Sequence, residues 1–185
     1  PSLSSLYETA ASFVTTFPEF DPYRSLRKGA TWGPLESLPG PMGPPKSKTY
    51  FAYLTADIPA SAEVLKGLAA SGLQGQAYLR GAHPSLKADL RQAGVDLLDA
   101  PASMEQVLAE RALIVHHGGV GTSQQAAAAG RPQVLVPWHL EQGCNAAVLE
   151  GCGLGRRLTS AGEAADVVGG LLDEDESMKK AQAFA

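Results

Sequence analysis

The stretch Ala112-Leu-Ile-Val-His-His-Gly-Gly-Val-Gly-Thr-Ser-Gln-Gln-Ala126 decides the fold. An apolar run ends at two histidines, a cluster of glycines follows, and a helix-like segment opens at Thr122 or Ser123. Glycines let the backbone turn sharply and let a ligand approach the main-chain amides closely. The start of a helix leaves unpaired N–H groups and a partial positive charge. The pattern therefore predicts a strand–turn–helix unit that can cradle a phosphate without a lysine.

A glycine-rich turn is weak evidence by itself, because any tight strand-to-helix turn has this composition. Two more specific motifs fit worse. The dinucleotide fingerprint needs a third glycine where this chain has Gln124, and it follows the first strand rather than the fourth. A P-loop needs a lysine after the glycines, and none is present. His117 can add a hydrogen bond or a positive charge to a diphosphate oxygen, whereas His116 is interpreted as a structural residue at the strand end.

Short apolar runs alternate with helix-like segments on both sides of this turn. The runs predicted to be strands are Tyr50–Leu54, Gln76–Leu79, Val95–Leu98, Leu113–Val115, Gln133–Val136 and Leu154–Leu158. The predicted helices are Ser61–Ala70, Ser85–Gln92, Ala102–Glu110, Thr122–Ala129, Gln142–Glu150, Ala161–Leu172 and Ser177–Ala185. This alternation predicts an α/β fold, a Rossmann-like parallel sheet of about six strands with helices on both faces.

The segment before these elements is rich in proline. Seven of the thirteen prolines lie between Pro18 and Pro45, which argues against a helix interior or a central strand there. We predict that residues 1–46 are the remnant of an N-terminal domain and an interdomain linker, with helical spacing over 3–10 and a strand over 12–17. Residues 47–172 are then the Rossmann-like domain, and 173–185 a helix that packs on the N-terminal domain. The absence of a starting methionine agrees with a piece cut from a longer protein.

Composition excludes several other classes. The chain has 185 residues, of which 44% are hydrophobic and 18% charged, so a packed core is expected. The 15 basic and 19 acidic residues form no polybasic patch, and no apolar run is long enough to span a membrane. Cys144 and Cys152 are too few for a disulfide framework or a four-ligand zinc site. The acidic run 173–176 is interpreted as a solvated surface. We expect a soluble, cytoplasmic protein without nucleic-acid, membrane or metal binding.

The residues after the turn make the prediction more specific. They read Gly130-Arg-Pro-Gln-Val-Leu-Val-Pro-Trp-His-Leu-Glu-Gln-Gly-Cys-Asn-Ala146. Taken together, His116–Asn145 resembles the donor-binding signature of family 1 glycosyltransferases with the GT-B fold, which include plant secondary-product enzymes and bacterial enzymes that act on antibiotics and macrolides. The shared features are the histidine, the glycine turn, Gly-x-Pro, and a proline followed by acidic-Gln and Asn-Ala.

The resemblance implies a function for the chain. It would be the donor-binding domain of an inverting, metal-independent hexosyltransferase that uses a UDP- or dTDP-sugar and no cofactor. A small-molecule acceptor would bind through the N-terminal domain. The family's catalytic base also lies there, so no catalytic residue is expected in this chain.

The resemblance also implies roles for individual residues. The diphosphate would be bound by His117, Gly118, Gly119, Val120, Gly121 and Thr122. The ribose would meet Gln125, and the sugar would meet Glu141, Gln142 and Asn145. Trp138 follows a strand near the sugar positions and is a further candidate for sugar contact. Thr55 is a weak candidate near the phosphates and base.

The chain departs from the plant signature at the base and the ribose. Asp99 replaces the tryptophan that begins the signature, Ala102 replaces a glutamine, and Gln125 replaces a glutamate. Backbone groups of Leu98, Asp99 and Ala100 would then contact the base. These departures keep other functions open: a non-catalytic nucleotide-binding or activator module, a GT-B-fold sugar-nucleotide epimerase, or a nicotinamide oxidoreductase. The sequence does not specify the sugar, the base, the acceptor or the oligomeric state.

Overall fold

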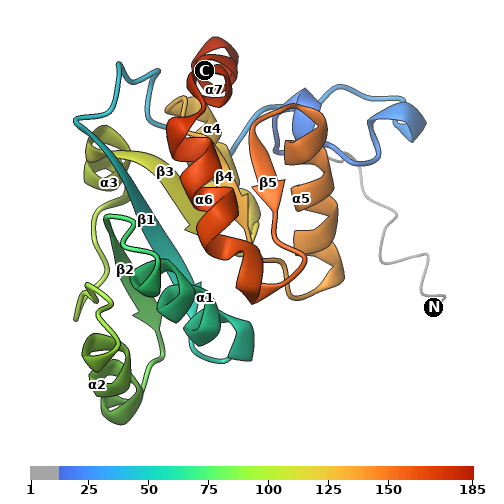
Figure 1. Cartoon of the computed structure of the whole chain (residues 1–185). Helices are drawn as coiled ribbons and strands as arrows, with labels where there is room; N and C mark the ends of the chain where they lie inside the picture. Colours follow the sequence, from blue (N-terminus) through green and yellow to red (C-terminus); the bar gives the residue numbers. More distant parts are fainter. Residues whose placement is uncertain (1–12) are drawn as a thin grey trace, which may run out of the picture.

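The computed structural model describes residues 13–185 and contains one parallel sheet (Figure 1). The strands are β1 (Ser47–Thr55), β2 (Gly75–Arg80), β3 (Arg111–His116), β4 (Gln133–Leu135) and β5 (Gly155–Arg157), in the order β2-β1-β3-β4-β5. The Rossmann-like prediction is confirmed. The predicted helix over 3–10 lies outside the described residues, and residues 13–17 form no strand.

The expected sixth strand is the exception to the strand count. Residues 95–98 run parallel to β2 but form only a single bridge, between Leu97 and Ala77. The reason lies in the sequence, because Asp96 and Asp99 flank the two leucines and Pro101 follows closely. Acidic residues and proline are depleted in strands, so the pairing does not extend along the segment.

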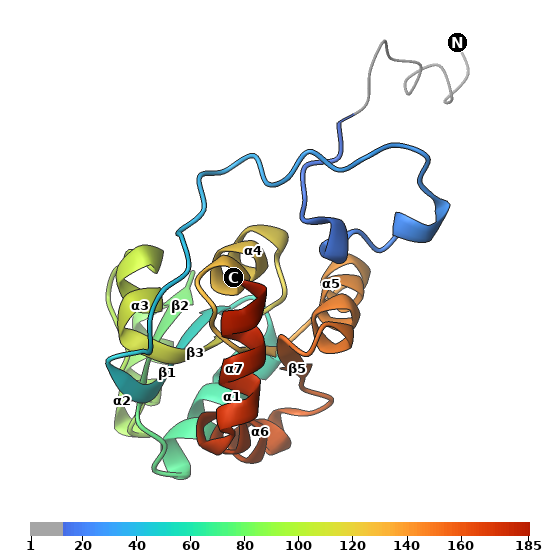
Figure 2. The same cartoon turned by 90° about the horizontal axis from the view of Figure 1, so that it is seen from above.

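Helices cover both faces of the sheet, as Figure 2 shows. On one face, α1 (Pro59–Ala70), α2 (Pro84–Gln92) and α6 (Ala164–Asp173) bury their apolar side chains against β1, β2 and β3. On the other lie α3 (Met104–Glu110), α4 (Val120–Ala128), α5 (Leu140–Gly151) and α7 (Asp175–Phe184). Strands β3 and β4 are buried along almost their whole length, because a central parallel strand is covered on both faces.

The segment before β1 runs along the face that carries α3, α4 and α5 (Figure 2). It contains two short 3₁₀ helices, Pro18–Phe20 and Arg24–Leu26. Its rings pack on the end of α7, where Phe184 lies 5.7 Å from Phe17 and 5.6 Å from Phe20 between ring centroids. The segment and the last helix therefore share one apolar cluster with α5. That cluster fixes the path of the chain before the sheet.

A buried arginine fastens the same segment near β1. Arg131 is fully buried, and it donates hydrogen bonds to the carbonyl oxygens of Leu108 at 2.7 Å and Gly43 at 2.8 Å. Burial lowers the pKa of its guanidinium. Carbonyl oxygens satisfy the donors of the buried cation, as burial of a charge requires. The Gly-x-Pro motif thus has a structural role, because its arginine ties the segment before β1 to α3.

The strand order creates a crevice at the carboxyl ends of β1 and β3. The chain passes from β1 to its neighbour β2 on one side and then returns to β3 on the other side. Such a reversal leaves an opening between the two diverging connections, and ligands of open α/β sheets bind there. In this chain the opening lies between Thr55, the last residue of β1, and the glycine turn after His116.

Candidate functional site

The crevice contains a pocket of about 160 Å³. Its walls come from the ends of three neighbouring strands, the glycine turn and α5. They are formed by Tyr53, Leu54, Thr55, Arg80, His116, His117, Gly119, Thr122 and Gln142. Five of these were predicted from the sequence as site residues, and they come from parts of the chain far apart in sequence. The fold therefore brings Thr55 together with the glycine turn and Gln142.

A larger hollow, of about 630 Å³, lies elsewhere. Its walls include Pro132 and Gly155, which stand at the amino ends of β4 and β5, and residues of α7. Ligands of open parallel sheets bind at the carboxyl ends of the strands. We therefore place the candidate site in the smaller pocket.

The glycine turn needs glycine at Gly118. Its φ is +87°, and a Cβ there would lie 3.1 Å from the carbonyl oxygen of Gln142. Helix α4 begins at Val120, two residues before the predicted start, with Gly119 as an N-cap that offers no side-chain hydrogen bond. Thr122 consequently lies inside the first turn and points to the pocket wall rather than capping the helix. No side chain caps the start of α4, so its first amides remain as donors for an anion.

His116 holds this turn from inside the protein. Its side chain is buried, Nδ1 accepts a hydrogen bond from the Gly118 N–H at 3.1 Å, and Nε2 lies 2.8 Å from Oε1 of Gln133. These partners assign the proton to Nε2. Gln133 in turn donates to the carbonyl oxygen of Ser123 at 3.3 Å. Burial lowers the pKa of His116 to about 4, so the ring is neutral at pH 7.

His117 is held by main-chain groups at both ring nitrogens. Nδ1 donates to the carbonyl oxygen of Val136 at 2.8 Å, and Nε2 accepts from the Thr55 N–H at 3.0 Å. Burial is the main cause that lowers the pKa of His117, and the positive charge of Arg80 lowers it further. The ring is therefore neutral near pH 7 and has no free N–H. To donate to a phosphate, Nε2 must lose the Thr55 amide and gain a proton.

The predicted sugar residues divide into two groups. Gln142 lines the pocket and its Oε1 accepts from the Trp138 N–H at 2.9 Å. Asn145 instead braces the turn, because its Nδ2 donates to the carbonyl oxygen of Gly118 at 2.8 Å. Glu141 and Trp138 lie outside the pocket, with Trp138 61% exposed. Of this set, only Gln142 lines the pocket.

The predicted ribose residue lies one turn further along α4. Gln125 donates from Nε2 to the Glu36 carboxylate at 3.4 Å, and Gly121 also lies next to that carboxylate. Glu36 comes from the segment before β1. The amide of Gln125 is therefore directed towards this segment.

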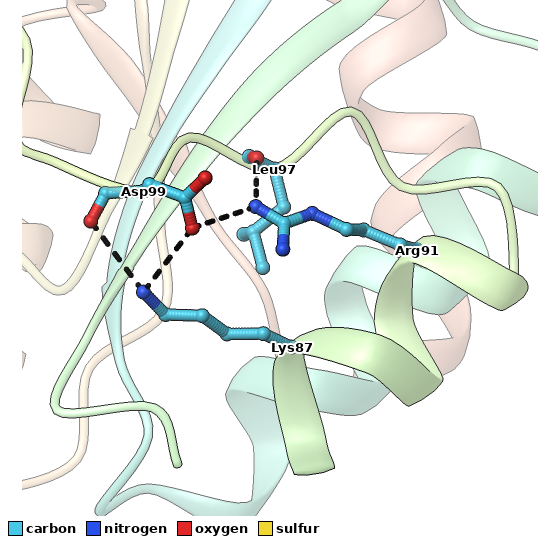
Figure 3. Close-up of polar contacts among 4 residues, drawn as sticks. All are labelled: Lys87, Arg91, Leu97 and Asp99. Carbon is cyan, nitrogen blue, oxygen red and sulfur yellow. Dashed lines mark hydrogen bonds and ion pairs between the residues drawn. The ribbon is translucent and has the colours of Figure 1, made fainter. Parts of the chain in front are cut away.

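The predicted base residues Leu98, Asp99 and Ala100 do not line the pocket. Figure 3 shows the polar contacts that hold Asp99 instead. Asp99 accepts from Arg91 at 2.9 Å and forms an ion pair with Lys87 at 3.7 Å. Arg91 also donates to the Leu97 carbonyl oxygen at 3.0 Å, and Lys87 to that of Asp99 at 3.4 Å. The hydrogen bond from Arg91 is the main cause that lowers the pKa of Asp99.

The neighbours of Asp99 differ from it in environment. Leu98 is half-buried and packs with the cluster under α3 and α4, while Ala100 is exposed. The loop is thus anchored by Leu98 on one side and by two basic side chains on the other.

Four of the nine residues that line the pocket were not predicted as site residues: Leu54, His116, Arg80 and Tyr53. Arg80 and Tyr53 lie at or near strand ends. Arg80 ends β2, one residue beyond the predicted strand, and Tyr53 lies in β1 and stacks on Tyr78 with ring centroids 6.0 Å apart. A signal for both was present, because alternate strand residues share a face and strand ends meet at the ligand edge. Arg80 directly follows the predicted strand Gln76–Leu79, so its position at the ligand edge of the sheet was predictable.

The remaining candidates show no site. Within residues 13–185, no group of three His, Cys, Asp or Glu side chains is arranged to hold a metal ion. The acidic run from Asp173 is exposed and contributes ion pairs to Lys48, Arg156 and Lys180. Cys144 and Cys152 are free thiols. In the described part of the chain, no helix has the length and apolar character needed to cross a membrane.

Comparison with known proteins identifies the class that this fold and crevice define. The structure is similar to the solved glycosyltransferase SnogD from Streptomyces nogalater at 25% identity and a TM-score of 0.65, covering 92% of this chain and 49% of that one. LpCGTa in complex with UDP matches at 18% identity and a TM-score of 0.68, with coverages of 93% and 47%. The spinosyn rhamnosyltransferase SpnG matches at 19% identity and a TM-score of 0.60, covering 76% of this chain and 41% of that one.

The family follows from a sequence match to residues 91–183. The chain belongs to the family described as the C-terminal domain of erythromycin biosynthesis protein CIII-like proteins. It spans less than half of the length of each of these three solved structures. Among curated proteins, none matches the chain significantly. The expected identity, a C-terminal domain of a GT-B fold family 1 glycosyltransferase, is confirmed.

Proposed function

We propose that this chain binds a nucleotide diphosphate sugar in the crevice between β1 and β3, as the donor-binding part of an inverting, metal-independent glycosyltransferase. The observation that carries the proposal is the pocket itself, in which Thr55, the open first turn of α4 and Gln142 face one another. A family match over residues 91–183 supports the same function. One solved relative in fold, LpCGTa, is in complex with UDP.

The chemistry suits the departure of a nucleoside diphosphate. Charge develops on the leaving diphosphate as the sugar bond breaks, and fixed amides at a helix N-terminus stabilise it without reorganising. Because Gly118 and Asn145 lock the turn, these amides are held in position before the donor binds. The acceptor and the general base would come from the other half of the full-length protein, acting on a small molecule.

The sugar end of the donor would extend towards the start of α5. Gln142 offers an amide N–H₂ to sugar hydroxyls, because its oxygen already accepts from Trp138. Glu141 is exposed in the first turn of α5 and would accept from hydroxyls once the donor and the second half of the enzyme cover it. A carboxylate there disfavours a uronic acid and favours a neutral or amino sugar.

Titration of UDP, dTDP and GDP into the chain by calorimetry tests the proposal. We expect binding of at least one of them, weakened about 10- to 100-fold by His117→Ala, because that change removes the ring that holds Thr55 and Val136. The matched control is His83→Ala, on the exposed N-cap of α2 outside the pocket. No binding of any nucleotide at millimolar concentration would remove the proposal.

A second candidate is a nucleotide-binding module without transfer activity. The observation that favours it is the ion-paired Asp99 loop, which offers no aromatic ring for a base. Assay of the full-length protein with a UDP- or dTDP-sugar separates the two functions. Turnover excludes the non-catalytic module, and nucleotide binding without turnover favours it.

We further propose that residues 13–46 and α7 form the side that faces the N-terminal domain. The cluster of Phe17, Phe20 and Phe184 supports this division, because it joins the segment before the sheet to the last helix. Small-angle scattering of the full-length protein before and after deletion of 175–185 tests it. Loosening of the two domains is expected, and an unchanged profile would contradict the role of α7.

A further inference from the structure

The candidate site lacks a cation among the residues predicted from the sequence. A bound diphosphate brings two or more negative charges into the pocket, and helix amides offset only part of them. The glycine turn contains no lysine or arginine. His117 does not fill the gap, since both of its ring nitrogens are held by main-chain groups.

Arg80 stands where this charge is needed. It is the last residue of β2 and lies beside Thr55 in the sheet register. It lines the same pocket as His117, Gly119 and Thr122. Its positive charge contributes to the lowered pKa of His117, which agrees with their closeness.

The arginine is also uncommitted within residues 13–185. There its guanidinium makes neither a hydrogen bond nor an ion pair, whereas Arg91 is bound to Asp99 and Leu97, and Arg131 to Leu108 and Gly43. A guanidinium presents a planar fork of donors that fits two phosphate oxygens at once. A cation without a partner in an anion pocket points to the ligand as its partner.

We propose that Arg80 is the cation of the donor site and that its guanidinium binds the diphosphate of the nucleotide sugar, opposite the amides of α4. This inference rests on the proposed function and adds a binding residue to it. It explains how the pocket holds a diphosphate without a metal or a basic loop. It also predicts selectivity, because a nucleoside without phosphate gains nothing from Arg80.

Three variants of the full chain test the inference. Arg80→Gln removes the charge and keeps the length of the side chain, Arg80→Lys keeps the charge without the fork, and Arg156→Gln is a control on the edge strand β5, outside the pocket. UDP, pyrophosphate and uridine are titrated into each, with amide NMR shifts as the readout for the weak ligands. A pH titration of the His117 ring by NMR needs no ligand.

The expected result has four parts. Arg80→Gln weakens UDP and pyrophosphate about 10- to 100-fold and leaves uridine unchanged, Arg80→Lys recovers part of the loss, and Arg156→Gln has no effect. The pKa of His117 rises in Arg80→Gln, because a neighbouring positive charge is gone.

Three results would overturn it. UDP affinity within two-fold of the parent chain in Arg80→Gln, with binding still lost in His117→Ala, refutes the role of Arg80 and leaves the proposed function standing. Equal losses for UDP and uridine mean that Arg80 only shapes the pocket. No nucleotide binding by the parent chain refutes the proposed function, and the role of Arg80 with it.

Discussion

Two loops at the same edge of the sheet are built in opposite ways. The turn between β3 and α4 is held by buried contacts, with His116 bound to Gly118 and Gln133. The loop around Asp99 is held at the surface, by ion pairs to Arg91 and Lys87. The first matches the family signature closely, and the second departs from it.

The difference indicates that one loop maintains the structure of the pocket and the other can vary its ligand specificity. A buried, fully satisfied network costs much to disturb, because any lost partner leaves a desolvated polar atom. Exposed ion pairs contribute little to stability, so a substitution at Asp99 is expected to cost little. We propose that in this chain the turn sets the preference of the pocket for a phosphate group, whereas the Asp99 loop adjusts which base it accepts.

The largest expected effect is from His116→Ala. It leaves a cavity and strips Gly118 N–H and the Gln133 side chain of a buried partner, so we expect a loss of about 3–4 kcal/mol in the free energy of unfolding. Urea denaturation followed by circular dichroism measures it. A loss below about 1 kcal/mol would mean that the network does not hold the turn.

The pH dependence of stability comes next. Because the pKa of His116 is about 4 in the folded protein and about 6.5 when unfolded, the unfolded chain binds more protons between these values. Stability is full above about pH 6.5 and falls by about 3 kcal/mol as the pH drops to about 4. His117 contributes in the same direction. Unfolding curves of the parent and His116→Gln should converge at acid pH, and parallel curves would contradict the assignment.

Gly118→Ala should cost about 2 kcal/mol. The left-handed φ of +87° strains any side chain, and the new Cβ would press on the Gln142 carbonyl oxygen. Gly143→Ala is the control, because this helical glycine has no neighbour within 4 Å of an added Cβ and should gain stability. Thermal melts of both variants suffice, and equal melting temperatures would argue against a strained turn.

Asp99→Ala should have the smallest effect on stability, below about 1 kcal/mol, since its ion pairs are exposed. Relative affinity for UDP, dTDP and GDP is the informative measurement. A changed order of affinity for the three nucleotides would support a role of the Asp99 loop in base selection. A large loss of stability would contradict the difference between the two loops, because the Asp99 loop would then be needed for the fold.

Much of the fold is predictable from the sequence because periodicity is local. The alternation of apolar runs and helices, and the glycine turn at Gly118, require only neighbouring residues. The prediction of a strand over residues 95–98 was wrong, because only one bridge pairs this segment with β2. Hydrophobic periodicity does not indicate whether a segment can pair with a strand at the edge of a sheet.

The candidate site was predictable only in part. The turn is one continuous motif and could be found from the sequence. The hydrogen bonds between Thr55 and His117 and between Gln133 and His116 instead join residues far apart in sequence, which the sheet register brings together. Arg80 was not predicted as a site residue because it lies at the end of a strand and no motif surrounds it. Contacts that depend on the register between strands cannot be predicted from a motif of consecutive residues.

The most direct test of the account is a UDP titration followed by backbone amide NMR. If the crevice is the donor site, the largest shift changes will occur at Thr55, His117 and residues 118–122, with smaller changes near Asp99. Shifts confined to the hollow beside β5 and α7, or none at millimolar UDP, would contradict the claim that the crevice between β1 and β3 is the donor site.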